Sequence, residues 1–382
     1  MDFAFTTEQQ MAINEAKKFA DEKLAPVVTD LDAKGEVNLS ALKELGKLGY
    51  LAITLPEEYG GAQMDAIAYA GTMLELSKVD AGTAVAVSVH NSLVNEGILK
   101  FGSEKQKGQF LPKLATGEWL GCFSLSEANA GSDPGALRTS ARRDGDFWIL
   151  NGTKNFTSNG DIADVIVVFA QTDKEAGAKG ISAFILKKET AGFKVGKHEN
   201  KMGIRTASCT ELIFDNCKIP GDALLGLENK GLRIALTLLD GGRIGIAAQA
   251  IGIAEAALEE AIHYAKAREQ FNRPLAKFQA IRFMLAEMAT DVELAKTMLF
   301  RVAWLKESGV KDYVKEAAML KLFASEMSHR VCHKALQIHG GYGYMKDFKI
   351  ERLYRDQRIT EIYEGTSEIQ KIVISRRILG QE

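Results

Sequence analysis

Residues 144–152 have the sequence Asp-Gly-Asp-Phe-Trp-Ile-Leu-Asn-Gly, and this stretch sets the middle of the chain apart from its two ends. Four consecutive apolar residues, Phe147 to Leu150, lie between an Asp-Gly pair and an Asn-Gly pair. Short apolar runs that are bounded by turn-forming pairs are typical of β-strands, whereas helices need longer segments with a spacing of three to four residues. The stretch therefore predicts a strand with a turn on either side.

Similar runs surround this strand between residues 121 and 230. They are Val165–Phe169, Ile181–Leu186 and Glu211–Phe214, which are short, largely apolar and separated by turn signals. Short strands in close succession favour a small sandwich or barrel. We therefore predict a middle β-sandwich or barrel domain over residues 121–230.

Helical spacing of apolar residues fills the chain on both sides of this β segment. We predict an N-terminal helical domain over residues 1–120 and a C-terminal helical bundle domain over residues 231–382, which makes the chain an α+β multidomain protein. Asp240 is expected to cap the first long helix of the C-terminal part, which would run to about Phe271. Later helices are expected at 278–308, 312–338 and 367–378.

Composition excludes several classes of protein. The 382 residues carry 48 Lys and Arg against 50 Asp and Glu, which gives a net charge of −2. This balance argues against nucleic-acid binding and against a polybasic membrane binder. The longest uncharged apolar runs, such as Ile244–Ala254, are too short to span a bilayer, so we predict no membrane insertion. Acidic residues near the start do not fit a signal or transit peptide, so we expect a cytoplasmic protein in a bacterium, or an organelle-matrix protein if a transit peptide was removed.

Common nucleotide and hydrolase motifs are missing from the sequence. It contains no GxxxxGK[ST] loop, no GxGxxG after a strand and no GxSxG elbow. His329, Cys332 and His333 share one helix at a spacing that can face a metal, but no matching pair of ligands occurs elsewhere. Helix packing explains these three residues better, and we predict no metal site.

Two segments of the β part combine an aromatic residue, hydroxyl groups and a glycine turn. They are Phe123–Asp133 and Asn155–Gly160. A flat ring such as a flavin needs an aromatic wall and a few hydrogen-bond donors at its edge. An ordinary turn explains either segment alone, whereas two such segments together favour a ring-binding site.

Three further segments each have two interpretations. Arg268, at a predicted helix end, can bind a pyrophosphate with its planar guanidinium, or it can simply be solvated. The glycines of Gln337–Gly341 either admit a ligand to the backbone or cap a helix. Glu364 is a general-base candidate if it is buried beside apolar surface, but a loop glutamate is usually solvated. Thr366 or Ser367 can cap the helix that follows, whose N-terminus would favour a negatively charged group.

Taken together, these segments resemble the acyl-CoA dehydrogenase family over essentially the whole chain, and its short-chain, butyryl-CoA type most closely. Each segment is modest by itself, but six of them occur in the order that the family shows. They are Leu125–Asp133, Gly152–Gly160, Asp240–Arg243, Arg268–Phe271, Gln337–Gly343 and Ile362–Thr366.

The resemblance implies the acyl-CoA dehydrogenase fold, with a C-terminal four-helix bundle, FAD bound between the last two domains, and a homotetramer built as a dimer of dimers. The residues implied to surround the flavin ring are Phe123, Leu125, Ser126, Phe156, Thr157 and Ser158, and Thr366 and Glu368 would hold the same cofactor from the C-terminal side. The residues implied to reach the FAD of a neighbouring subunit are Arg268, Phe271, Gln279, Gln337, Gly340 and Gly341. The acyl-CoA would contact Ser132, Asp240, Arg243 and Gly365.

By the same resemblance, Glu364 is the catalytic base. It would take the α-proton of a short-chain acyl-CoA while a β-hydride passes to flavin N5, giving trans-2-enoyl-CoA, and an electron-transferring flavoprotein would accept the electrons. The thioester oxygen would be bound by the Glu364 N–H and a flavin ribityl hydroxyl, which stabilises the enolate. Some relatives carry the base just before the arginine of the Asp-x-x-Arg run, but Gly242 stands there in this chain. Thr157 departs from the isoleucine of many members and would add a hydroxyl near the flavin.

Two kinds of alternative remain open at this point. Within the enzyme class, the chain can be a specialised relative that acts on branched, cyclic or dicarboxylic acyl-CoA, or an enoyl-CoA reductase. Outside it, the fold can serve a non-catalytic FAD-binding protein that binds a partner or nucleic acid. The balanced charge and the intact Glu364-Gly365 pair count against the last alternative.

Overall fold

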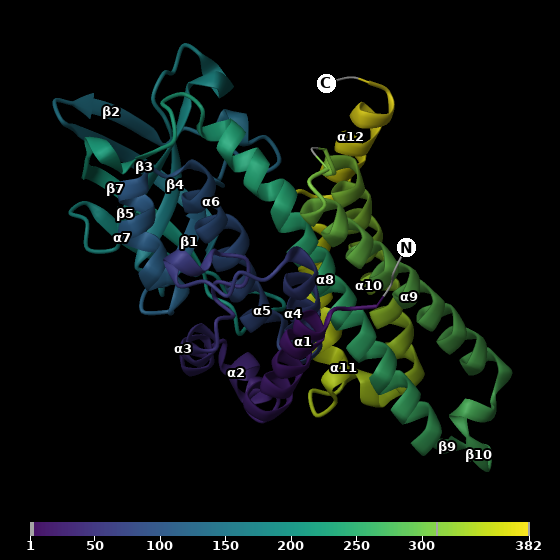
Figure 1. Ribbon diagram of the computed structural model, residues 1–382. Helices are drawn as coiled ribbons and strands as arrows, with labels where there is room; N and C mark the ends of the chain where they lie inside the picture. The colour runs from purple at the N-terminus through teal and green to yellow at the C-terminus, as the bar shows by residue number, and fades with distance from the viewer. Residues whose placement is uncertain (1–3, 311, 381–382) are drawn as a thin grey trace.

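The computed structural model describes residues 4–310 and 312–380, in which helices form the two ends of the chain and strands form the middle (Figure 1). The helices of the N-terminal part are α1 (Thr7–Phe19), α2 (Val28–Lys34), α3 (Leu39–Lys47), α4 (Ala66–Val79), α5 (Ala81–Ser88), α6 (Glu96–Phe101) and α7 (Glu104–Ala115). The backbone widens into π-helix at Ala20–Leu24 and at Val89–Asn95. Thr6 and Gln9 form a capping box that starts α1.

The middle of the chain forms one strongly bent sheet. Its strands are β1 (Gly121–Ser124), β2 (Ser140–Asp144), β3 (Phe147–Ser158), β4 (Val165–Gln171), β5 (Ile181–Lys187), β6 (Phe193–His198), β7 (Cys209–Pro220) and β8 (Leu224–Leu225), in the order β6-β7-β3-β2-β4-β5-β8, with β1 parallel to β4. A single residue pair, Ser140 with Gln171, joins its two halves. Trp148 of one half packs on Phe184 of the other with ring centroids 5.3 Å apart, so the two halves enclose an apolar interior as a sandwich does.

The C-terminal part is a bundle of long helices. They are α8 (Gly231–Ala267), α9 (Gln279–Glu307), α10 (Val314–His339) and α12 (Ser367–Ile378), with the shorter α11 (Lys349–Gln357) beside them. A small hairpin of β9 (Glu269–Gln270) and β10 (Arg273–Pro274) joins α8 to α9 (Figure 1). The predicted order of helical, β and helical parts is therefore confirmed.

The predicted start and end of the first long helix were wrong. Helix α8 begins at Gly231, so Asp240 lies inside it and does not cap it, and α8 ends at Ala267, before Phe271. A tertiary contact sets the start: a Cβ built on Gly231 would lie 2.4 Å from the backbone carbon of Ser182 on β5. Only glycine allows this close approach of helix to sheet, and α8 begins there without a side-chain cap.

Helix α8 is also the one helix among the described residues that is long and apolar enough to cross a membrane. In this fold, 78% of its most apolar 18-residue window is buried inside the protein. It packs between α4 and α10 (Figure 1) and supplies a large part of the main apolar core. An all-round apolar helix is expected at such a position.

Candidate active site

The loop before α12 holds Glu364 and Gly365 in unusual backbone conformations. Their φ angles are +49° and +90°. A left-handed conformation is unfavourable for any residue other than glycine and persists only where the surroundings impose it. Here Lys321 Nζ donates a hydrogen bond to the carbonyl oxygen of Gly365 at 2.7 Å, and Gln370 Nε2 donates to the same oxygen at 2.9 Å. Contacts from α10 and α12 therefore fix the loop.

The carboxyl group of Glu364 is turned into the protein. Its Oε2 atom is buried and has no hydrogen-bond partner among the described residues. Burial raises the pKa of Glu364 to about 7, although the positive charges of Lys321 and Arg243 act to lower it. A carboxyl group with a pKa near neutrality can take up a proton and release it again.

Helix α8 provides the space for this carboxyl group through Gly242. A Cβ built on Gly242 would lie 2.3 Å from Glu364 Oε2 and 3.4 Å from Leu93 Cδ2. The loop carboxylate and a side chain at position 242 therefore exclude each other. The structure thus gives a steric reason for glycine at this position.

Arg243 and Asp240 lie one turn apart on α8 and form an ion pair at 2.7 Å. The Arg243 side chain is buried, and its Nε has no hydrogen-bond partner among the described residues. Burial raises the pKa of Asp240, and Arg243 partly offsets this effect. A guanidinium with an unpaired N–H beside the Glu364 loop can donate a hydrogen bond to a further acceptor group. Thr366 caps α12 by accepting from the Ile369 N–H at 3.3 Å.

The predicted ring-binding segments come together along β1 and β3. Phe123 is half-buried and packs on Phe169, and the Asn155 N–H donates to the Ser126 carbonyl oxygen at 2.9 Å, which ties the exit of β1 to β3. Phe156 has a φ of +56° at an irregularity in the pairing of β3 with β7, and 66% of it is exposed. An exposed aromatic ring held by a strained backbone is available as a wall for a flat ligand. Leu125 and Ser158 are half-buried in the same two segments, whereas Ser132 is exposed on the turn after β1.

The hydroxyl of Thr157 does not lie where the sequence led us to expect it. Thr157 is buried, and its Oγ1 lies 2.7 Å from Ser124 Oγ inside the middle domain. The irregularity at Phe156 turns the side chains on this strand, so that Thr157 faces inward. Any contact of Thr157 with a ring beside Phe156 would therefore use its backbone.

Sequence reasoning missed two buried lysines. Lys154 pairs with Glu127 at 2.7 Å and also donates to Leu125 oxygen at 3.0 Å, while Glu127 accepts from the Arg138 and Thr139 backbones. This ion pair fixes the loop that follows β1.

The second lysine, Lys321, is fully buried on α10. The signal that can reveal Lys321 is its helical spacing, because it shares the buried stripe of α10 with Ala317 and Ala324.

The remaining predicted residues form a second group at the other end of α8. They are Arg268, Phe271, Gln279, Gln337, Gly340 and Gly341, around the β9–β10 hairpin and the end of α10 (Figure 1). Arg268 lies over the Tyr342 ring at 5.5 Å, and 87% of Phe271 is exposed. Gly242, which lies beside Glu364, and Arg268, just after α8, are 26 residues apart, which is about 39 Å along the helix at about 1.5 Å per residue. One chain therefore does not bring the two groups together.

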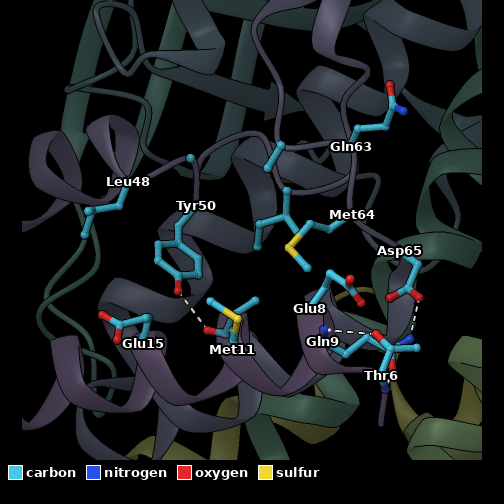
Figure 2. A pocket seen from close by; sticks show the side chains of 14 residues that line it. Thr6, Glu8, Gln9, Met11, Glu15, Leu48, Tyr50, Gln63, Met64 and Asp65 are labelled. Carbon is cyan, nitrogen blue, oxygen red and sulfur yellow. Dashed lines mark hydrogen bonds between the residues drawn. The ribbon is translucent and has the colours of Figure 1, made fainter.

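The structure has a further groove, which contains none of the predicted site residues. It has a volume of about 640 Å³ and lies between α1 and the loop of residues 48–65, with Met11 and Met64 in its lining (Figure 2). Figure 2 also shows the hydrogen bond from the Tyr50 hydroxyl to the Ala12 carbonyl across it, at 2.8 Å. Within residues 4–310 and 312–380, no three His, Cys, Asp or Glu side chains are grouped as metal ligands.

Comparisons with known proteins agree along the whole chain. The N-terminal, middle and C-terminal domains of acyl-CoA dehydrogenase match residues 6–118, 122–217 and 229–379. The short-chain specific acyl-CoA dehydrogenase of Clostridium acetobutylicum is 46% identical, over 99% of this chain and 100% of that protein.

Two solved structures superimpose closely. Butyryl-CoA dehydrogenase from Megasphaera elsdenii is 45% identical with a TM-score of 0.98, over 99% of this chain and 100% of the other. A chain of the structure of the electron transferring flavoprotein of Acidaminococcus fermentans is 48% identical with the same TM-score and the same shares covered. The chain therefore belongs to the acyl-CoA dehydrogenase family.

Proposed function

We propose that this protein is an FAD-dependent dehydrogenase that converts a short-chain acyl-CoA thioester to the trans-2-enoyl-CoA and passes the electrons to an electron-transferring flavoprotein. The observation that carries the proposal is the buried carboxyl group of Glu364, whose Oε2 has no partner among the described residues and whose pKa is raised to about 7. The similarity to a short-chain specific enzyme, to a butyryl-CoA dehydrogenase and to a chain from an electron transferring flavoprotein structure supports the substrate class and the partner.

The residues present fit FAD. The exposed Phe156 ring offers a wall for the flavin. In the same two segments, Ser126 and Ser158 offer hydrogen-bond donors and Leu125 offers an apolar packing surface. Thr366 and Glu368 would hold the cofactor from the start of α12. When bound, FAD supplies the acceptor for the β-hydride at flavin N5.

We further propose that the second group of residues serves the FAD of a neighbouring copy, in a dimer of dimers. The support is the length of α8, which separates Arg268 and Phe271 from the first group. Large apolar side chains are exposed along α9 as well: Phe283, Leu294 and Trp304 are each more than half exposed. Exposed aromatic side chains are enriched at subunit interfaces, which supports this use of α9.

We also propose that the chain has three domains, over residues 1–120, 121–230 and 231–382. We propose that the protein is located in the bacterial cytoplasm or in an organelle matrix.

The chain's own groups would act as follows. Glu364 accepts the α-proton, and expulsion of water by the substrate favours this by keeping the pKa of the carboxyl group near neutrality. The Glu364 N–H donates to no acceptor among the described residues, so it is available for the thioester oxygen, where the enolate charge develops. Arg243, Asp240, Ser132 and Gly365 would contact the acyl-CoA.

The test is substitution of the base. We expect Glu364→Gln to retain FAD and acyl-CoA binding, but to bleach the flavin about a thousandfold more slowly with butyryl-CoA under anaerobic conditions. Glu118→Gln is a matched control, because it removes the same charge from an exposed residue that pairs with Lys113 and takes no part in the site.

Three outcomes would contradict the proposal in different ways. Full bleaching in Glu364→Gln would exclude the base. A wild-type protein that is bleached by branched, cyclic or dicarboxylic acyl-CoA, but not by butyryl-CoA, is a specialised relative. A yellow protein that no acyl-CoA bleaches is a non-catalytic FAD-binding protein or a reductase, and oxidation of its reduced form by crotonyl-CoA separates these two.

A further inference from the structure

Lys321 is a fully buried lysine without a carboxylate partner. Its side chain lies on α10 with no measurable exposure, and no carboxylate among the described residues forms an ion pair with its Nζ. The hydrogen bond from Nζ is to a neutral acceptor, the Gly365 carbonyl at 2.7 Å. Burial of an ammonium group is costly unless it is compensated, so a lysine kept in this state is expected to have a role.

The contact falls on the strained loop that carries the base. Glu364 and Gly365 both have positive φ angles, and the carbonyl oxygen that follows them is held by Lys321 and by Gln370. Two donors on one oxygen fix the plane of the peptide after Gly365. Because the loop is short, that plane also determines where the Glu364 side chain and its N–H point.

We propose that Lys321 is a positioning residue for Glu364: its Nζ holds the Gly365 carbonyl so that the carboxyl group faces the substrate, and its positive charge favours the ionised form of that carboxyl group. This inference rests on the proposed function, because it assumes that Glu364 is the base. Gln370 shares the first task but not the second, since an amide carries no charge.

The charged and titratable groups around the loop agree with this division of tasks. Burial raises the pKa of Glu364, and Lys321 is the larger of the two opposing influences. Burial lowers the pKa of Lys321 to about 8, and Glu364 is the first group that opposes this. Each charged form therefore favours the charged form of the other group. The groups that act on the pair are Arg243 from α8, Tyr69 from α4, Tyr363 and Glu361 from the segment before the loop, and Glu368 from α12.

The experiment compares Lys321→Met with Gln370→Met in the FAD-loaded enzyme. The first variant removes a donor and a charge, whereas the second removes a donor to the same oxygen and no charge. The rate of flavin bleaching by butyryl-CoA is measured in a single turnover across pH 5.5–9. Proton uptake on binding of an unreactive thioether analogue of butyryl-CoA is measured by calorimetry in buffers of different ionisation heat.

We expect Lys321→Met to raise the midpoint of the pH–rate profile by about one unit, which makes bleaching about tenfold slower at pH 6. It should also shift the pH range of proton uptake in the same direction. Gln370→Met should slow bleaching without moving the midpoint. Lys321→Arg, which keeps the charge but changes its position, should leave the midpoint within about 0.3 units of wild type.

An unshifted midpoint in Lys321→Met, with bleaching slowed equally at all pH values, would overturn the proposal and leave only a structural role. If Lys321→Met does not fold, Lys321→Gln, which keeps a donor and loses the charge, carries the same prediction. Glu364→Gln separates this failure from failure of the proposed function. If Glu364→Gln still bleaches fully, the base is wrong. If Glu364→Gln is inactive and Lys321→Met has an unshifted midpoint, only the role of Lys321 is wrong.

Discussion

Gly242→Ala tests how tightly helix α8 and the Glu364 loop share one space. The added methyl carbon would lie 2.3 Å from Glu364 Oε2, and contacts under 3.0 Å are essentially never seen for real Cβ atoms, so the carboxyl oxygen must move by at least about 0.7 Å. A displacement of about 1 Å at a reacting group costs about 100-fold in rate. The helix itself gains from the change, because alanine is about 1 kcal/mol more favourable than glycine in a helix interior. We therefore expect a well-folded, FAD-containing variant that is bleached about 100-fold more slowly.

The neighbouring glycine provides the matched control. A Cβ on Gly241 would meet its nearest atoms, on Glu96 and Lys306, at 3.5 Å, which is an ordinary contact. Gly241→Ala should therefore gain the same helix stability and keep the wild-type rate. The assays are anaerobic single-turnover bleaching by butyryl-CoA, the ratio of flavin to protein absorbance, and thermal unfolding. Bleaching of Gly242→Ala within threefold of Gly241→Ala would refute the steric argument.

Three further predictions concern stability and the flavin environment. The folded pKa of Glu364, about 7, lies above its ordinary value of 4.5, so this group stabilises the fold fully below pH 4.5 and loses that effect as the pH rises to 7. Over this pH range, the free energy of unfolding of wild type in urea should therefore fall relative to that of Glu364→Gln. A difference that stays constant with pH would contradict this prediction. Lys154→Met should lower the free energy of unfolding by about 3 kcal/mol, because it leaves Glu127 buried without its partner, and adding Glu127→Gln should recover part of this loss. Losses in denaturant titrations that simply add in the double variant would argue against a stabilising ion pair. Thr157→Val should lower the free energy of unfolding by about 1 kcal/mol, because the hydrogen bond to Ser124 is lost, and should leave the flavin absorption spectrum unchanged. A shifted spectrum would mean that the hydroxyl of Thr157 reaches the flavin ring.

The sequence predicted the elements whose signals are local. The strand predicted at 147–150 is part of β3, but the turn predicted after it was wrong, because β3 continues through Asn151-Gly152 to Ser158 with only an irregularity in its pairing. The last helix has the predicted bounds Ser367–Ile378, and Thr366 caps it. The start of α8 was not predictable in this way. It depends on the contact of Gly231 with β5, which joins residues about 50 positions apart in the chain.

The candidate site was predictable where family motifs carried it, and not where burial decides the chemistry. Glu364 was identified by its motif, but its raised pKa follows from packing that no local pattern records. Lys321 was missed because a lysine on a helix is normally solvated, and the inward turn of Thr157 was missed because a β-irregularity reverses the alternation of side chains. The roles of the residues around Arg268 and Phe271 stay predictions.

The length of α8 has a consequence for how this chain can change over evolution. The helix joins the sheet at Gly231 to the hairpin after Ala267, so each residue inserted into it after Arg243 would move everything beyond by about 1.5 Å and turn it by about 100°. Arg268 and Phe271 would then face a different direction from the copy they are proposed to serve, although every local contact at Glu364 stayed intact. An insertion of seven residues, close to two turns, would nearly restore the direction but lengthen the helix by about 10 Å. The length of α8 thus fixes the distance and the direction of Arg268 and Phe271 relative to the Glu364 site. Insertions within α8 should therefore be far rarer than insertions in the loops of the sheet.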